Sequence, residues 1–293
     1  MKENRISTNR KFALALGGGG ARGLAHIGVL KVLEREKIPI ALITGTSIGA
    51  VIGGIYAQSP NSQLVELKFR EFLASPVYRR SGLGFFRRPR AAENLFAQVA
   101  THVRERVVIS LARTRQSIMS SRRLRRALDF LLDEEGIENT KIPFAAVAVD
   151  LYSGEEIVLQ NGDMKTAIAA SASIPGFLPP ISYDSSLLVD GAVIAPVPVT
   201  AAFELGAEMV IAVDVSPELE PQPELENVID IVFRTGMITA QKYRMLLVQK
   251  AHVVIRPQVG QVHWSEFELI DTLIAEGVRA AERALPQIQA ICQ

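Results

Sequence analysis

The stretch FALALGGGGARGLAHIGVLKVLEREKIPIALITGTSIGAVIGGIYAQ, residues 12–58, decides the fold of this 293-residue chain. Residues 12–16 are apolar and run into four glycines, and apolar positions then recur at helical spacing over residues 21–37. Residues 40–44 indicate a second buried strand, and residues 48–58 predict a second helix directly after it. This order of strand, turn, helix, strand, turn, helix predicts a parallel sheet covered by helices, with functional groups at the carboxyl ends of the strands.

The later part of the chain also alternates between predicted strands and predicted helices. Apolar runs and turn signals predict strands at residues 144–149, 156–159, 187–189, 209–213 and 253–255, and helices at 164–172, 229–249 and 267–285. A short hairpin should follow the first of these strands, because Ser153-Gly154 separates Leu151-Tyr152 from residues 156–159. The chain is long enough to bury a substantial core, and we expect one α/β domain over residues 1–293.

A strongly basic segment, about residues 76–126, breaks the alternation. Its only acidic residues are Glu93 and Glu105, whereas its arginines are Arg79, Arg80, Arg87, Arg88, Arg90, Arg104, Arg106, Arg113, Arg115, Arg122, Arg123, Arg125 and Arg126. Apolar residues recur at every fourth position from Leu95 to Leu111, which is typical of an amphipathic helix. We expect a basic helical insertion that packs on the α/β core.

Composition narrows the choice of partners and location. Lys plus Arg is 32 and Asp plus Glu is 31, so a net charge of +1 predicts no nucleic-acid partner. No stretch offers about 20 uninterrupted apolar residues, and the start lacks a signal-peptide core; we expect a cytoplasmic protein, or one peripheral to a membrane. A single cysteine, Cys292, excludes an intrachain disulfide, and four scattered histidines give no zinc-like cluster. We expect no metal and no other cofactor.

Gly45-Thr46-Ser47-Ile48-Gly49 has the G-x-S-x-G form and lies between an expected strand and an expected helix. A serine in that position is held on a tight turn with its hydroxyl exposed, and small flanking residues let strand and helix approach closely. The amino end of the helix also favours negative charge at the serine. The alternative is a Thr/Ser turn that only caps the helix. The context favours Ser47 as a nucleophile.

The glycine-rich loop Gly17-Gly18-Gly19-Gly20-Ala21-Arg22-Gly23 lies at the first strand-to-helix junction. Consecutive glycines let backbone N–H groups point inward and bind an anion, either a phosphate or a reaction oxyanion. The spacing also matches the dinucleotide fingerprint, but the next strand does not end in an acidic residue for a ribose. Beside a G-x-S-x-G motif, the loop favours an oxyanion hole in which Arg22 adds positive charge; the alternative for Arg22 is a surface position.

Asp190-Gly191-Ala192 follows the expected strand at residues 187–189. An Asp-Gly pair alone indicates a turn. A serine nucleophile needs a proton acceptor, however, and none of His26, His102, His252 and His263 lies at the end of an expected strand. Asp190 is therefore the candidate base.

Together these motifs resemble the patatin-like phospholipase family, in particular its bacterial cytosolic branch. The family pattern has a G-G-G-x-R/K-G loop, a G-x-S-x-G elbow and a D-G-A/G motif, which match residues 18–23, 45–49 and 190–192. Residues 170–176, Ala-Ser-Ala-Ser-Ile-Pro-Gly, are similar to the family's A-S-x-x-I-P-x segment. The resemblance covers about residues 11–216; the insertion and the C-terminal helical region, about 217–293, lie outside it.

The resemblance implies a three-layer α/β/α sandwich with a largely parallel central sheet, and a Ser-Asp dyad that cleaves acyl-ester bonds of lipids without a metal. It assigns Ser47 as nucleophile and Asp190 as base. Oxyanion contacts would come from Gly18, Gly19, Gly20 and Arg22, and Gly23, Gly45, Gly49 and Gly191 would support the motifs.

Three functional readings share these motifs. A phospholipase A or lysophospholipase-like esterase transfers the acyl group to water, and an acyltransferase transfers it to an alcohol. A regulatory protein would instead bind an acidic lipid or phosphorylated metabolite in the glycine loop with little turnover. A free Asp is a weak base at neutral pH, so the esterase reading requires burial to raise the pKa of Asp190. The basic insertion suggests peripheral contact with an anionic membrane surface, although a solvated basic helical cap is an equal alternative.

Overall fold

The computed structural model describes residues 12–81, 117, 120–219 and 225–292. Its centre is one mixed sheet with the strands β1 (Phe12–Leu16), β2 (Leu42–Thr46), β3 (Phe144–Asp150), β4 (Glu156–Leu159), β5 (Ile181–Tyr183), β6 (Ser186–Asp190), β7 (Met209–Val213) and β8 (Val253–Ile255). The hydrogen-bonded path through the sheet is β5-β6-β3-β2-β1-β7-β8, and β4 also pairs with β3. The pairs from β3 to β8 along this path are parallel, whereas β4, β5 and β6 pair antiparallel.

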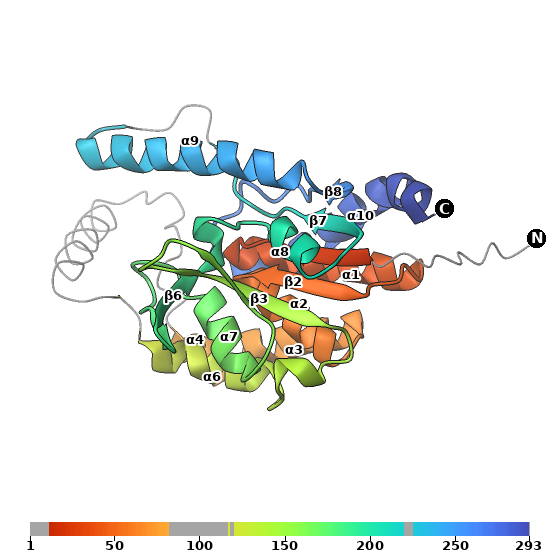
Figure 1. The fold of residues 1–293 in the computed structure, drawn as a ribbon, viewed down its shortest axis with the longest axis horizontal. Coiled ribbons are helices and arrows are strands. Elements are labelled where there is room, and N and C mark those ends of the chain that lie inside the picture. The colour runs from red at the N-terminus through yellow and green to blue at the C-terminus, as the bar shows by residue number, and fades with distance from the viewer. Residues whose placement is uncertain (1–11, 82–116, 118–119, 220–224, 293) are drawn as a thin grey trace, which may run out of the picture.

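Helices cover both faces of this sheet (Figure 1), which confirms the three-layer α/β/α arrangement. The helices are α1 (Ala25–Arg35), α2 (Ile48–Gln58), α3 (Ser62–Ala74), α4 (Pro76–Ser81), α6 (Ser121–Leu131), α7 (Met164–Ser171), α8 (Val199–Glu204), α9 (Val228–Val248) and α10 (Ile270–Cys292). Short 3-10 turns span Gly20–Leu24, Ile137–Asn139, Gly191–Val193 and Phe267–Leu269.

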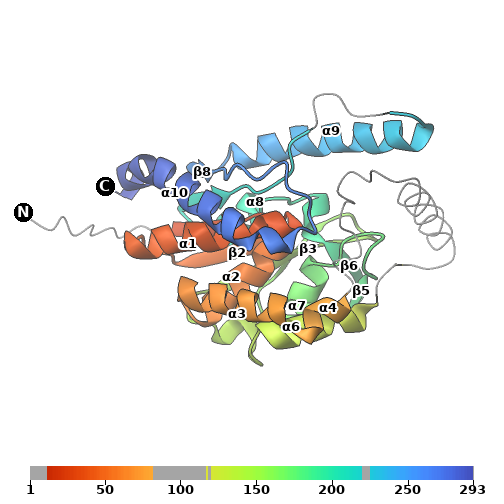
Figure 2. The same ribbon diagram turned by 180° about the vertical axis from the view of Figure 1, so that it is seen from behind.

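The two faces of the sheet carry layers of different thickness. Strand β1 alternates, so that Leu14 and Leu16 join the large apolar core beneath α1, α2 and α10, whereas Ala13 and Ala15 face α8. The small side chains on the second face match the short α8, which packs there with the carboxyl end of α9. The rest of α9 extends beyond the sheet in both views (Figures 1 and 2).

The C-terminal helix α10 packs directly on α1 through a pair of glycines. A Cβ atom at Gly28 would lie 2.0 Å from the carbonyl oxygen of Ile274, and one at Gly277 would lie 1.9 Å from that of Ala25. Any larger side chain at either position would push the two helices apart. The helix α10 is therefore built into the main core.

Several element boundaries differ from the sequence predictions. The helix expected at residues 21–37 is divided into a 3-10 turn and α1, and the strand expected at 40–44 lies at Leu42–Thr46. The pairing of β2 with β1 begins only at Leu42, opposite Ala13, which explains the later start. Helices α3 and α8 and strand β5 were not predicted from the sequence.

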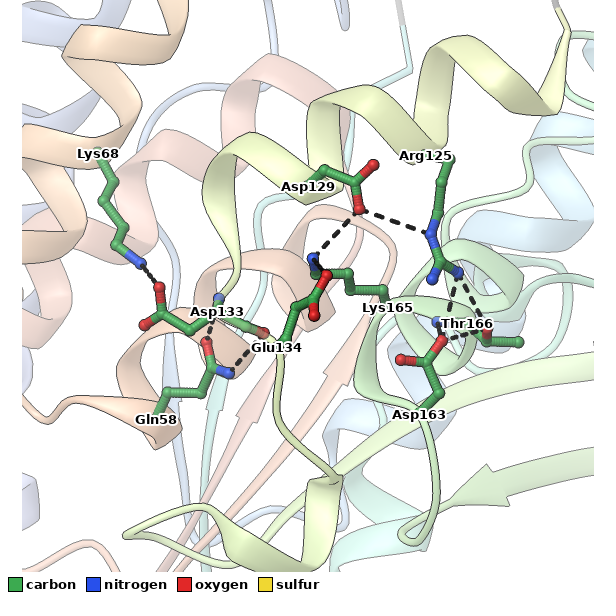
Figure 3. Close-up of polar contacts among 9 residues, drawn as sticks. All are labelled: Gln58, Lys68, Arg125, Asp129, Asp133, Glu134, Asp163, Lys165 and Thr166. Atoms are coloured by element: carbon green, nitrogen blue, oxygen red, sulfur yellow. Dashed lines mark hydrogen bonds and ion pairs between the residues drawn. The ribbon is translucent and has the colours of Figure 1, made fainter.

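Most of the predicted basic insertion, residues 82–116 and 118–119, lies outside the described residues. Its two ends are described, as α4 and the start of α6. Figure 3 shows how polar contacts fasten α6 to the core: Arg125 contacts Asp129, Asp163 and Thr166, and Lys165 pairs with Asp129 and Glu134. Arg125 is exposed, and its contacts with Asp163 and Thr166 link α6 to the start of α7 at the surface.

Candidate active site

Ser47 occupies a strained turn between β2 and α2. Its backbone has φ 56° and ψ −124°, a conformation that residues other than glycine rarely adopt. The residue is buried, with 6% of its surface exposed. A strained serine between a strand and a helix is the geometry of a nucleophile elbow.

The flanking glycines make this turn sterically possible. A Cβ atom at Gly45 would lie 2.5 Å from the Cα of Ala50, and one at Gly49 would lie 2.2 Å from the carbonyl oxygen of Leu16. Gly23 meets the same helix, because a Cβ there would lie 2.3 Å from Cγ2 of Ile48. These positions, which the sequence suggested as supporting ones, are occupied by glycine because backbone or side-chain atoms fill the space.

Asp190 ends strand β6 and reaches Ser47. The Ser47 hydroxyl lies close enough to the Asp190 carboxyl group to lower its pKa as a hydrogen-bond donor, and Oδ1 of Asp190 accepts a hydrogen bond from the Ala192 N–H at 2.8 Å. Gly191 lets the chain turn here, since a Cβ would lie 2.3 Å from the carbonyl oxygen of Val147. The structure therefore brings together the two residues that the sequence had proposed as nucleophile and base.

Burial changes the proton affinity of Asp190. Only 3% of the residue is exposed, and desolvation raises the pKa of its carboxyl group from 3.8 to about 6, although the Ser47 hydroxyl and the Ala192 N–H oppose that rise. At neutral pH the carboxyl group is still ionised, but it is a stronger base than a free Asp. This is the change that the sequence-based reading required.

Ser171, the last residue of α7, and Ser173, two residues later, bond to the backbones of Ser47 and Asp190. Ser171 accepts a hydrogen bond from the Ser47 N–H (3.0 Å) and donates one to the Val147 carbonyl (2.6 Å). The carbonyl of Ser173 accepts from the Asp190 N–H at 3.0 Å. Sequence reasoning did not assign these roles; the only signal was the resemblance of residues 170–176 to a family segment.

The threonines of β2 fix the segment after Asp190. Thr46 donates from Oγ1 to the carbonyl oxygen of Ala195 at 2.8 Å, and Thr44 donates likewise to that of Pro198 at 2.9 Å. Both hydroxyls are buried. The strand that carries the elbow thus also positions the loop that carries the Asp-Gly motif.

The glycine loop lies against Ser47, and its amide groups are not equivalent. A Cβ at Gly18 would lie 3.2 Å from the Cβ of Ser47, so the loop and the serine are in contact. The Gly18 N–H already donates to Pro196 at 2.9 Å. Within the described part of the chain, no acceptor is recorded for the N–H groups of Gly19 and Gly20, and Gly20 has φ +59°. Gly18 therefore acts as a close-contact residue, and Gly19 and Gly20 have amides available for an anion.

A buried histidine, His26, contacts the first residue of the glycine loop. Nε2 of His26 lies 2.8 Å from the carbonyl oxygen of Gly17, and because a carbonyl only accepts, this nitrogen carries the proton. Burial lowers the pKa of His26 to about 4, against the opposing effects of Gly17 and Asp214, so the ring is neutral at pH 7. Of the other histidines, His252 accepts from Val210 and His263 contacts Ser265, whereas His102 lies outside the described residues.

Arg22 is not the surface residue of the alternative reading. It is buried, with 8% exposed, and donates from Nη1 to the carbonyl oxygen of Val262 at 2.9 Å. Burial, and then the nearby charge of Arg244, lower the pKa of Arg22 to about 10, which leaves it cationic at neutral pH. With Gly18 and Gly19, it lines a pocket of about 240 Å³ that α9 borders on the far side.

A family model described as patatin-like phospholipase matches residues 14–203 of the chain. The chain belongs to the patatin-like phospholipase family. The patatin-like region includes β1, the elbow and the Asp-Gly motif, and it ends within α8, before α9 and α10.

Relatives with the same domain are found in distant organisms. The chain is 32% identical over 218 residues to patatin-like phospholipase domain-containing protein 6 of Homo sapiens, which covers 74% of this chain and 14% of the human protein. It is 33% identical over 215 residues to an uncharacterized NTE family protein of Mycobacterium tuberculosis, which covers 72% of this chain and 51% of that protein. The chain thus spans about half or less of the length of these relatives.

Solved structures give a more distant similarity. VipD from Legionella pneumophila matches with a TM-score of 0.48 and 13% identity, over 96% of this chain and 67% of that one. The type III effector ExoU matches with a TM-score of 0.34 and 12% identity, over 95% of this chain and 53% of that one.

Proposed function

We propose that this chain is a serine hydrolase that cleaves acyl-ester bonds of lipids, with Ser47 as nucleophile and Asp190 as base. The observation that carries the proposal is the placement of the Ser47 hydroxyl beside a buried Asp190, whose carboxyl group has its pKa raised to about 6 by desolvation. Membership of the patatin-like phospholipase family supports a lipid substrate.

The reaction begins when Oγ of Ser47 attacks the ester carbonyl carbon and its proton passes to Asp190. The carbonyl oxygen becomes an oxyanion, which accepts hydrogen bonds from the N–H groups of Gly19 and Gly20. Gly18 does not donate in this scheme, because its N–H is bound to Pro196. Arg22 adds a fixed positive charge beside the loop rather than a direct bond.

Collapse of this tetrahedral intermediate breaks the ester bond. The leaving alcohol takes the proton from Asp190, and the acyl group remains on Ser47. Water then attacks the acyl-enzyme while Asp190 accepts its proton, and the carboxylic acid product leaves as the proton returns to Ser47. A dyad without histidine suits esters, because an alcohol leaving group needs less protonation than an amine.

Labelling with a fluorophosphonate probe tests the dyad directly. Wild type should be labelled at Ser47, Ser47→Ala should not be labelled, and Asp190→Asn should be labelled much more slowly. Circular dichroism and a cooperative unfolding curve establish that each protein is folded. A folded wild type without label on Ser47, or Ser47→Ala labelled at an equal rate, overturns the proposal.

We also propose peripheral contact of the basic segment with anionic lipid headgroups, in keeping with a protein that acts at membranes from the cytoplasm. Among the described helices, none is both long and apolar enough to cross a bilayer. Arg80, Arg123 and Arg126 line a cavity of about 320 Å³ between α4 and α6. Guanidinium groups in such a cluster suit phosphate oxygens.

Vesicle sedimentation tests this contact. We expect binding to vesicles with anionic phospholipids, weaker binding as salt increases, and little binding to neutral phosphatidylcholine vesicles. The double substitution Arg123→Gln with Arg126→Gln should reduce the binding. Equal binding to both vesicle types, unaffected by salt, contradicts the contact.

A further inference from the structure

The pocket beside the glycine loop has a charge pattern that the acyl-transfer chemistry does not use. Among the described residues that line it, the charged ones are Arg22, from the loop, and Arg244, from α9, and none is acidic. Helix α9 lies outside the region that the family model matches, so Arg244 is a feature of this chain's own C-terminal part.

Arg244 is held in a defined position. Its Nη1 donates to Oδ1 of Asp214 at 3.0 Å, and 12% of its side chain is exposed. Asp214 follows β7 and has 2% of its side chain exposed; its other oxygen lies 3.5 Å from Nε of Arg256. One carboxylate is therefore shared between two guanidinium groups, and with Arg22 nearby the cluster keeps an excess of positive charge.

Two buried polar atoms of pocket-lining residues have no hydrogen-bond partner within the part of the chain that the structure describes. They are Nε of Arg22, a residue more than nine-tenths buried, and Oγ of Ser216. Both residues line the pocket. Buried donors are almost always satisfied in folded proteins, so an unsatisfied donor beside a cavity fits a site whose acceptor comes from a bound ligand, ion or water. An anion with several oxygen atoms is the class of ligand that offers acceptors to such donors and balances the excess positive charge.

The position of this pocket relates it to the proposed reaction. Gly18 and Gly19 form one wall, and the same loop contacts Ser47, so a group in the pocket lies next to the reacting ester. The other walls are mainly apolar, with Val193, Leu219 and Met237 among them. This combination suits a lipid whose anionic group and glycerol carbons occupy the pocket while its ester lies at Ser47.

We propose that Arg244, with Arg22 and Ser216, binds the phosphate group of an acyl-ester substrate and makes the site select phosphate-bearing lipids over uncharged ones. The proposal rests on the hydrolase function of the same site and deepens it. Arg244 is a specificity-determining residue in this scheme, because its contacts with the phosphate replace those that water makes to a free lipid.

The kinetic test compares two substrates with the same acyl chain, a 1-acylglycerol 3-phosphate and a 1-acylglycerol. Arg244→Gln should raise KM for the phosphate substrate about tenfold or more, as expected for loss of a charged hydrogen bond, and leave KM for the uncharged one unchanged. Arg244→Lys should retain part of the preference. Lys242→Gln removes the same charge from an exposed position on the same helix and should change neither substrate.

A binding test separates this inference from the proposed function. Calorimetric titration of Ser47→Ala with the 1-acylglycerol 3-phosphate should give binding that Arg244→Gln weakens, and inorganic phosphate should compete weakly. If wild type turns over neither substrate but binding depends on Arg244, the hydrolase function fails and the subsite stands. If turnover occurs and Arg244→Gln affects both substrates equally or neither, the subsite fails. Binding of inorganic phosphate as tight as that of the lipid also overturns it, because a free anion is then the ligand.

Discussion

Thr46 and Asp190 occupy neighbouring positions along one edge of strand β3. Thr46 pairs with Val147 and Asp190 pairs with Ala148, while β4 pairs with both of these β3 residues and so takes the opposite edge. Strands β2 and β6 therefore meet end to end on the same side of β3. Ser47, the next residue after Thr46, faces Asp190 because the two strands converge there from opposite directions.

The pH dependence of catalysis should report on Asp190. The carboxyl group accepts a proton only when it is ionised, and burial raises its pKa to about 6. We expect kcat/KM for an uncharged ester to fall about tenfold per pH unit below pH 6 and to reach a plateau above it. Measurement between pH 4.5 and 8.5 checks this. An inflection near the ordinary Asp value of 3.8, or a flat profile, would show that Asp190 is not the buried base.

Asp190→Asn should stabilise the fold at alkaline pH while it removes activity. The folded-state pKa lies above the unfolded value, so the stability that Asp190 contributes is complete below pH 3.8 and is lost as pH rises through 6. A rise from 3.8 to about 6 corresponds to about 3 kcal/mol. Asn stays neutral, so urea unfolding at pH 8 should give a higher free energy of unfolding for the variant than for wild type.

A second buried carboxylate supplies the matched control for that comparison. Asp214 has two arginine partners, so Asp214→Asn leaves Arg244 and Arg256 without their acceptor. We expect this variant to lower the free energy of unfolding at pH 8. Equal destabilisation by both substitutions would mean that the ionised form of Asp190 is not costly to bury.

His26 should have the opposite effect on stability from Asp190. Its pKa falls from 6.5 to about 4 on folding, so its contribution is complete above pH 6.5 and is lost as pH falls towards 4. Between pH 4 and 6 the two residues act in opposite directions and largely cancel in wild type. In Asp190→Asn only the His26 effect remains, and unfolding free energy should fall clearly from pH 6.5 to 4.5. A pH-independent variant would contradict this assignment.

The local signals of the sequence predicted β1, β7 and β8 with their observed bounds, because each is a short apolar run flanked by glycine, histidine or a charged residue. The observed bounds of β4 and α2 were predicted as well. The pairing of Ser47 with Asp190 was reached by excluding histidines and by resemblance to the family. No local pattern could reveal it, because it depends on which strands share an edge of β3. The Ser171 contact with the Ser47 N–H is equally long-range. The Arg244 contact joins α9 to β7, which periodicity alone does not pair.

Ser171→Ala should slow labelling of Ser47 without preventing folding. The substitution removes the acceptor for the Ser47 N–H and leaves that buried donor unsatisfied, which costs about 1–3 kcal/mol. If part of this cost falls on the strained elbow, the rate should decrease about tenfold. Ser173→Ala is the matched control, because its equally buried hydroxyl donates to the carbonyl of Ala169 in the preceding helix, and the Ser173 carbonyl that accepts from Asp190 is retained. Equal rates for the two variants would show that Ser171 does not position the elbow.

Gly277→Ala should destabilise the protein strongly, although Gly277 is far from the proposed dyad in sequence and has no role in the proposed reaction. The added methyl would lie 1.9 Å from the carbonyl oxygen of Ala25, so α10 must move away from α1, at a cost of about 1–3 kcal/mol or more. Gly236→Ala makes the same change on α9, where no atom lies within 4 Å of the new Cβ, and should stabilise the helix by up to about 1 kcal/mol. Urea unfolding of the two variants measures the difference.

Because α1 also carries His26, which bonds to the Gly17 carbonyl at the start of the glycine loop, Gly277→Ala should slow labelling of Ser47 as well. Similar stability for the two variants would mean that α1 and α10 are not in glycine-mediated contact.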